Sequence, residues 1–257
     1  MATLILVMAL AACNSKANDS SGSSVEQQMK DAVGEHPDSL LLKEQLIQYY
    51  RDSANYDKAI AYTDATLKKD SNNARLWKIK ATLHVENEDT LNAINALEKA
   101  VHINPDAEML SDLGTLYAEK NNPRSLDIAN SLLAQQKDKS AKNAFFIRGL
   151  YYNYSGDKMK AISNMDSCLT IDYTYMIAYR EKAIALYDLG KYNDAIAVLN
   201  KAITLQNNFD EGYYWRGMCL EKLGKNAEAL ASYRSALLYS PDYLEAQQAI
   251  DRLEKEK

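Results

Sequence analysis

Residues 176–209 read MIAYREKAIALYDLGKYNDAIAVLNKAITLQNNF, and residues 210–243 read DEGYYWRGMCLEKLGKNAEALASYRSALLYSPDY. Written one beneath the other, the two segments place small residues at the same offsets. Ala195 in the first segment stands over Ala229 in the second, 34 residues later. The stretch therefore indicates two copies of one structural unit.

The same spacing extends toward the N-terminus through three ladders of small residues, whose neighbours are 34 or 68 residues apart. The ladders are Ala59, Ala93, Ala161, Ala195 and Ala229; Ala81, Gly149, Ala183 and Gly217; and Ala100, Cys168, Ala202 and Ala236. Small residues allow two helices to approach closely. A period shared by three ladders indicates a stack of similar supersecondary units.

The chain between the small residues has the apolar periodicity of helices. From Met176 to Asn207, apolar residues recur at helical spacing, and the segment around Gly190 interrupts them. Gly190 is placed to end the first helix in a left-handed cap, and Gly156 and Gly224 are expected to do the same 34 residues to either side. Each unit is therefore predicted to be a helix, a tight turn and a second helix.

This pattern resembles the tetratricopeptide repeat (TPR) family. The family's order of large, small and aromatic residues is carried by Tyr213, Gly217, Leu220, Gly224, Ala229, Tyr233, Ala236 and Pro241, with Leu220 in place of the usual aromatic. The match covers six units, at 40–73, 74–107, 108–141, 142–175, 176–209 and 210–243. The resemblance implies an all-α fold, a right-handed α-solenoid of antiparallel helix pairs. It is specific for fold and much less so for function, because the repeat is a scaffold.

The segments around the six units (40–243) are expected to cap them. Residues 25–39 match a second helix without its first, and residues 244–257 form an amphipathic helix with Leu244, Ala246, Ala249, Ile250 and Leu253 on its inward stripe. Unit 108–141 fits least well, because its second helix opens with Pro123 and lacks the usual Ala. We expect a one-residue insertion and a local irregularity there.

The N-terminus resembles a bacterial lipoprotein signal. An apolar run in residues 1–12 ends in Leu10-Ala11-Ala12, Cys13 follows, and residues 14–24 are polar. The resemblance implies a signal peptide at 1–12, a lipidated Cys13 and a flexible tether to residue 24. The signal departs from the family in having no Lys or Arg before the apolar run, so an ordinary cleaved signal or a truncated gene model stays open. In some bacterial lipoproteins an Asp after the lipidated Cys retains the protein in the inner membrane. Residue 14 is Asn, so the resemblance favours the outer membrane of the cell envelope.

Composition and motifs exclude several functional classes. The formal net charge is −5, which gives no electrostatic basis for binding nucleic acid. His84 occupies a packing position that holds Tyr in other units, and His36 and His102 are expected to be solvated. Cys168 and Cys219 lie too far apart for a disulfide and are predicted to be buried free thiols. With no metal-ligand spacing, phosphate loop or catalytic triad, we expect no cofactor, no metal and no enzymatic activity.

The resemblance also implies a concave groove lined by the first helix of each unit. In the C-terminal half its lining mixes apolar anchors, phenols and one guanidinium, and these are the candidate partner-binding residues: Phe146, Leu150, Asn153, Tyr154, Ile177, Arg180, Ile184, Tyr187, Tyr214 and Met218. Such patches are typical of binding surfaces. In this hypothesis Arg180 pairs with an acidic group of a peptide. In the competing interpretation, several of these residues only seal neighbouring helices.

The leading functional hypothesis is a membrane-anchored TPR lipoprotein that acts as a protein–protein interaction scaffold in the bacterial cell envelope. Its partner would be a protein or peptide segment held in the groove. The alternative is a surface carbohydrate-binding module in which Tyr154, Tyr187 and Tyr214 stack on sugar rings. A structural spacer with no specific ligand also stays open.

Overall fold

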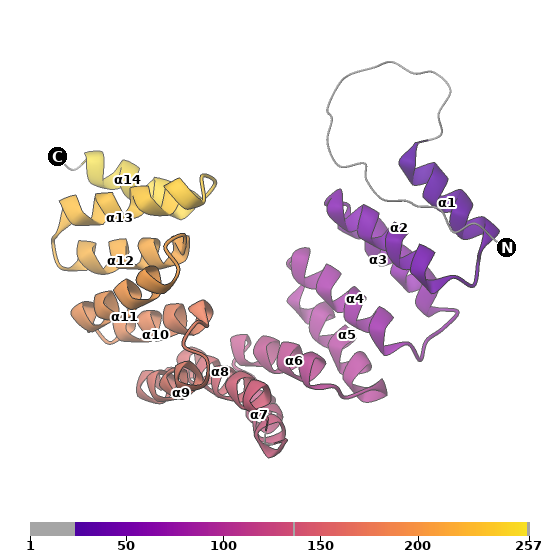
Figure 1. Cartoon of the computed structure of the whole chain (residues 1–257), viewed down its shortest axis with the longest axis horizontal. Helices are drawn as coiled ribbons and strands as arrows, with labels where there is room; N and C mark the ends of the chain where they lie inside the picture. Colours follow the sequence, from indigo (N-terminus) through magenta and orange to yellow (C-terminus); the bar gives the residue numbers. More distant parts are fainter. Residues whose placement is uncertain (1–23, 136, 256–257) are drawn as a thin grey trace. The chain divides into compact units, whose positions relative to one another are not determined.

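The computed structural model describes residues 24–135 and 137–255. In these residues it contains fourteen α-helices and no strand, which confirms the predicted all-α solenoid class (Figure 1). Consecutive helices pair as helix, turn and helix. The predicted signal peptide and the lipidation site Cys13 lie outside the described residues.

The described part of the chain divides into two compact units, one that ends at residue 62 and one that begins at residue 63. The first unit contains α1 (Val25–Glu35), α2 (Leu40–Asp52) and the start of α3 (Tyr56–Leu67). Helix α1 packs against α2, and the Tyr50 hydroxyl donates a hydrogen bond of 3.0 Å to the carboxylate of Glu26. This bond ties the helix that precedes the first repeat to the repeat itself.

The second unit contains the end of α3 and eleven further helices. They are α4 (Ala74–Glu86), α5 (Thr90–Ile103), α6 (Ala107–Glu119), α7 (Arg124–Ala134), α8 (Asp138–Ser155), α9 (Lys158–Ile171), α10 (Met176–Asp188), α11 (Tyr192–Leu205), α12 (Asp210–Lys222), α13 (Asn226–Tyr239) and α14 (Leu244–Lys255). From α4 onward each helix packs against the next along the chain, and α6, α8, α10 and α12 also contact one another in succession. The contacts are therefore mostly local in sequence, as a repeat array requires.

Several helices of the second unit begin at a side-chain cap. Asn73, Asp89, Asp106 and Asp157 each accept a hydrogen bond from the backbone N–H three residues on, at the starts of α4, α5, α6 and α9. Such caps satisfy backbone donors that have no partner inside the helix, and each contributes about 1 kcal/mol. They fix where the first turn of each helix begins.

The tight turn between the two helices of each repeat contains one residue in the left-handed region. Gly156, Gly190 and Gly224 have φ of 93°, 71° and 71°, which confirms the caps predicted for them. The three earlier units use Ala54, Glu88 and Asn121 in the same place, at φ of 52°, 59° and 52°. No glycine marks these three turns, although the backbone conformation is the same.

The small residues near the starts of the second helices are buried. Ala59, Ala93, Ala161, Ala195 and Ala229 are all fully buried. The third repeat, residues 108–141, lacks the usual Ala. Ser125 on α7, which is also 0% exposed, occupies the equivalent position. Ser125 lies 32 residues after Ala93 and 36 before Ala161.

The expected irregularity in unit 108–141 is present. Helix α7 has 11 residues, whereas the second helices α5, α9, α11 and α13 have 14. Helix α8 has 18 residues and begins at Asp138, earlier than the 142 expected from the period. The left-handed turn residues Glu88, Asn121 and Gly156 are 33 and 35 residues apart, so the repeat starts early and one residue is inserted after its turn, as expected. Ser125 follows Asn121 by four residues instead of the usual five, which makes the shift at Ser125 two residues. Pro123, the N-cap of α7, lies in this shortened turn.

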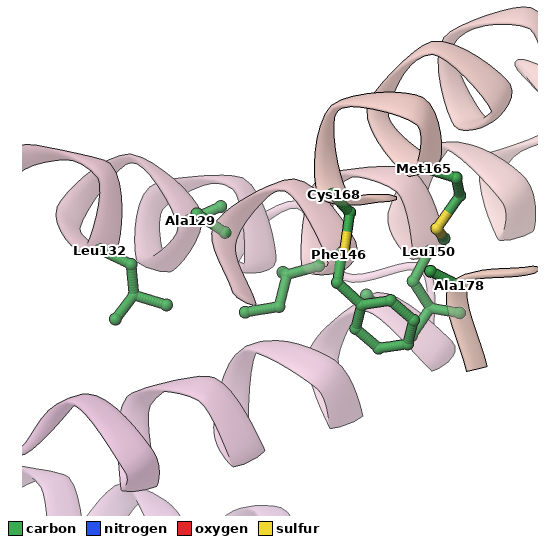
Figure 2. Close-up of a cluster of buried hydrophobic side chains, with 10 residues drawn as sticks. Ala129, Leu132, Phe146, Leu150, Met165, Cys168 and Ala178 are labelled. Carbon is green, nitrogen blue, oxygen red and sulfur yellow. The ribbon is translucent and has the colours of Figure 1, made fainter. Parts of the chain in front are cut away.

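A large apolar cluster of the second unit lies around this irregular repeat. Figure 2 shows Phe146 and Leu150 of α8 close to Met165 and Cys168 of α9. Cys168 and Cys219 are both free and fully buried, as predicted, and burial raises the pKa of each thiol to about 12. Both thiols therefore stay protonated and unreactive at neutral pH.

The predicted burial of the histidines and of the apolar face of α14 can be compared with the structure. His84 is buried as predicted, and burial lowers the pKa of its imidazole, while His36 and His102 are exposed. On α14, the predicted inward stripe is buried except for Leu244, which is 63% exposed. Leu244 is the first residue of its helix, so its side chain lies beyond the packed face.

Candidate partner-binding groove

A groove of about 510 Å³ lies in the second unit, over the first helices of four successive helix pairs. Helices α4, α6, α8 and α10 supply nearly all of its lining, and Tyr175, the N-cap of α10, also lines it. Of the ten predicted residues, five line the groove: Phe146, Leu150, Tyr154, Ile177 and Arg180. The structure thus brings together half of the predicted set, and these five residues lie on α8 and at the start of α10.

The floor of the groove is apolar and rigid. Phe146 and Leu150 are only 6% and 3% exposed, because the same side chains belong to the buried cluster of Figure 2. The rings of Phe146 and Tyr175 pack edge to face with centroids 5.2 Å apart. The floor is therefore held by the core of the repeat and can offer only its outer edge to a ligand.

The walls of the groove carry apolar side chains that are open to solvent. Val85 on α4, Tyr154 on α8 and Ile177 on α10 are 47%, 55% and 39% exposed. Exposed apolar side chains around a concave surface are the usual composition of a binding site. We call these three residues the apolar walls of the groove.

Arg180 is already paired within the chain. Its guanidinium lies 3.0 Å from Glu181 and 2.5 Å from Glu211 of α12, and the amide of Asn153 donates a further hydrogen bond of 3.1 Å to Glu181. Burial lowers the pKa of Arg180, but the two carboxylates more than offset this, so the pKa lies above its ordinary value. The positive charge of the guanidinium is thus balanced by two carboxylates of the same chain.

Two other carboxylates of the groove lack such close partners. Asp112 lies 4.0 Å from the ammonium of Lys78, which pairs at 2.7 Å with Glu108 instead. Glu119 makes no hydrogen bond or ion pair among the described residues. Burial raises the pKa of both carboxyls, and the charge of Glu181 raises that of Glu119 further. Both side chains nonetheless remain exposed to solvent, and neither carboxylate has a closely paired cation.

The other five predicted residues lie outside the groove. Asn153 is buried and accepts a hydrogen bond of 2.7 Å from Lys158. The ring of Tyr187 packs edge to face against Trp215, and the ring of Tyr214 packs against Tyr243 with centroids 4.9 Å apart. These contacts are those of residues that seal neighbouring helices.

Met218 on α12 packs against the core beneath α13 and α14, and Ile184 on α10 is half-buried. Neither side chain lines the groove. Whether any of the ten predicted residues binds a partner stays a prediction.

Sequence reasoning missed the part of the groove formed by α6. Asp112, Thr115 and Glu119 line it, together with Val85 and Glu181 from the neighbouring helices. The sequence does carry a signal, since Asp112 and Glu119 are seven residues apart and a helix places them on one face. That signal is obscured because unit 108–141 fits the 34-residue register poorly.

Metal sites and membrane-spanning helices are both absent from residues 24–135 and 137–255. No three His, Cys, Asp or Glu residues gather there in a way that could hold a metal ion. Helices with the length and apolar character needed to cross a membrane are also missing from the part of the chain that the structure covers.

Comparison with protein-family models identifies the repeats. A tetratricopeptide repeat model matches residues 45–108, a TPR repeat model matches 184–224, and a second tetratricopeptide repeat model matches 210–243. The chain therefore contains tetratricopeptide repeats, as its small-residue ladders predicted. A search of curated proteins found no matching relative.

Solved structures share the fold. A tetratricopeptide repeat protein from Parabacteroides merdae is similar with a TM-score of 0.76 at 19% identity, over 89% of this chain and 91% of that one. PilW, described as a widely conserved type IV pilus biogenesis factor, is similar with a TM-score of 0.65 at 21% identity, over 81% of this chain and 97% of that one. A thermophilic TPR protein of Thermus thermophilus has a TM-score of 0.62 at 19% identity, over 70% and 98% of the two chains. At these identities the likeness is one of fold.

Proposed function

We propose that this protein is a non-enzymatic interaction scaffold that holds a segment of a partner protein in the groove over α4, α6, α8 and α10. The observation that carries the proposal is the combination of a rigid floor with exposed apolar walls, formed by Val85, Tyr154 and Ile177. A preformed site loses little conformational entropy when a partner binds. The groove is also long enough to cross several repeats, which suits an extended or helical segment.

We further propose that the scaffold is attached to a bacterial membrane, most simply the outer membrane, through lipid on Cys13. This rests on the N-terminal sequence alone, where an apolar run ends in Leu10-Ala11-Ala12-Cys13 and a polar tether follows. PilW, which has a similar fold, is described as a pilus biogenesis factor, and a role in envelope assembly is the corresponding expectation here. Two or three acyl chains would hold the protein firmly, since each buried methylene contributes about 0.8 kcal/mol.

The carbohydrate alternative gains no support from the described residues. It needs several phenol rings with free faces, and Tyr187 and Tyr214 have aromatic neighbours against their rings. Tyr154 is the one of the three that is mostly exposed. A single accessible ring does not make a stacking platform for a glycan.

Photo-crosslinking in cells tests the groove. Benzoylphenylalanine is placed at position 154 in the groove and, as the matched control, at position 205, where Leu205 is 42% exposed on the second helix α11. We expect an ultraviolet-dependent adduct of one reproducible mass from position 154 only, and we expect Ile177→Ala in the same chain to weaken it. Adducts from position 205 alone would move the interface to the second helices and overturn the groove proposal.

The anchor is tested by incorporation of an alkyne-labelled palmitate and by membrane fractionation. The parent is expected to carry the label and to sediment with membranes, whereas Cys13→Ser is expected to lose both properties. Cys168 and Cys219 are buried thiols with a pKa of about 12, so they provide an internal control that should stay unlabelled. Membrane association that persists in Cys13→Ser would overturn the lipid anchor.

A further inference from the structure

We infer that the partner segment in the groove is cationic: it carries Lys or Arg side chains beside an apolar residue, and the cations lie against Asp112 and Glu119. This rests on the proposed groove function and specifies the chemistry of its partner. It also replaces the sequence-based expectation of an acidic group bound by Arg180.

The charge of the lining supports a cationic partner. Three carboxylates, Asp112, Glu119 and Glu181, face the groove, against one guanidinium, Arg180. Glu181 and Glu211 already neutralise that guanidinium. The unbalanced charge of the groove is therefore negative, and an acidic ligand would meet Arg180 with its charge already balanced by two carboxylates.

Asp112 and Glu119 are placed where an incoming cation would gain most. The two carboxylates lie on one face of α6 and line the groove, and both side chains are exposed, so a cation in the groove can reach them. Opposite charges that meet inside a groove are screened less than on an open surface. The ammonium of Lys78, which is the cation paired with Asp112, is held closer by Glu108 and leaves Asp112 at 4.0 Å.

The apolar walls of the groove favour a partner that carries an apolar side chain next to its Lys or Arg. Tyr154 and Ile177 line the groove together with the carboxylates of α6, and both side chains are exposed. A partner with an apolar side chain next to a Lys or Arg fills both environments at once, and the methylene stem of the cation can cover the apolar wall. A phenol ring such as that of Tyr154 also attracts a guanidinium or ammonium group.

The test is selection of a random peptide library displayed on phage against three forms of the purified full chain. One is the parent, the second is Asp112→Asn with Glu119→Gln, and the third is Tyr154→Ala with Ile177→Ala. All four side chains are at least partly exposed, so these changes leave the core intact. A further variant, Asp194→Asn with Asp251→Asn, is the matched control, since both aspartates are exposed on α11 and α14, outside the groove.

We expect the parent to enrich peptides in which Lys or Arg adjoins an apolar residue. Both groove variants should lose these peptides, and the control should keep them. For a synthetic peptide with lysines flanking a phenylalanine, the affinity should fall roughly three- to tenfold in the carboxylate variant. The same peptide with glutamates in place of the lysines should bind the parent more weakly than the lysine peptide does.

Two outcomes would overturn the inference, and they differ in what they say of the groove. Enrichment of acidic or uncharged peptides that depend on Tyr154 and Ile177 would leave the groove function standing and exclude a cationic partner. Binding that no groove variant weakens would exclude both the cationic partner and the groove itself.

Discussion

Helix pairs α10–α13 and the segment α6–α8 solve the same packing problem in different ways. In α10–α13, first helices have 13 residues, second helices have 14, and glycines at 190 and 224 form the turns. In α6–α8 the turn residue is Asn121, the second helix has 11 residues and the next helix has 18. Both nevertheless bury one small residue at the start of the second helix.

The comparison shows which features of the repeat are required. Helix length and sequence period vary, but the left-handed turn residue and the small buried residue are found in both regions. The backbone must reverse sharply and two helices must then approach closely, so these positions are fixed by sterics. The groove forms beside the segment that departs from the period.

The largest expected effect comes from replacing the small buried residue of the regular region, Ala195, by a larger one. Ala195→Leu adds a side chain where Ala195 is fully buried among Ala183, Leu199 and Cys219, so we expect a loss of about 1–3 kcal/mol in the free energy of unfolding. Urea denaturation followed by circular dichroism measures it. Asp194→Leu, at the exposed neighbouring position, should change stability by less than about 0.5 kcal/mol. Equal midpoints for the two variants would mean that the assigned register is wrong.

The turns give the next largest effect. Gly190→Ala places a side chain at φ of 71°, which should cost about 1 kcal/mol. Asn121→Gly should change stability by only about 0.3 kcal/mol, because Asn already tolerates φ of 52°. Thermal melts of the two single variants decide the point, and a larger loss at position 121 than at 190 would contradict the shared role of these turns.

Ser125 offers a comparison of opposite sign. Its hydroxyl is buried with no hydrogen-bond partner among the described residues, so Ser125→Ala should stabilise the chain by about 1 kcal/mol. The reciprocal change in the regular region, Ala195→Ser, should cost a similar amount, because it buries a hydroxyl beside apolar groups. Guanidinium denaturation of both variants tests the pair. A destabilised Ser125→Ala would show that the hydroxyl does have a partner.

The smallest effect concerns the groove, where Glu119→Gln should raise the stability at neutral pH by less than about 1 kcal/mol. The pKa of Glu119 is raised by burial and by Glu181, against opposing contributions from Lys120 and Arg180, so its ionised form costs stability in the folded state. The cost is present above the raised pKa and disappears as the pH falls below the ordinary carboxyl pKa. Melting temperatures of parent and variant should therefore converge in acid, and a difference that grows in acid would contradict this assignment.

The regular region was predictable because its periodicity is written in residue types that local sterics require. Gly156, Gly190 and Gly224 marked the turns, and Ala195 and its equivalents marked the helix contacts. Ala54 and Glu88 could not be found in the same way, since packing on both sides imposes their backbone conformation and their side chains do not favour it. Asn121 tolerates this conformation, but it lies in the repeat whose register is shifted.

The groove was predicted in part, and the limits have physical causes. The lining from α8 and α10 followed from position within the repeat, whereas Asp112 and Glu119 lie in the unit whose register is shifted. The roles of Arg180, Tyr187 and Tyr214 depend on which neighbours their long side chains reach. A position in a repeat fixes the direction of a side chain but not the pairs that it forms.

The compensated shift at Ser125 sets how this chain can be shortened or lengthened. Ala93 and Ala161 are 68 residues apart although Ser125 does not divide that interval equally. Removing residues 191–224 would rejoin two equivalent turns in phase, because Gly190 and Gly224 are one period apart. Removing 34 residues that begin at Ala93 would instead join Asn92 to Asp127, and the rest of α7 would be two residues out of phase, because Ser125 is the equivalent of Ala93. The helix pairs α6–α7 and α8–α9 can thus be duplicated or deleted only together without a change of register. The C-terminal pairs α10–α11 and α12–α13 can be gained or lost singly.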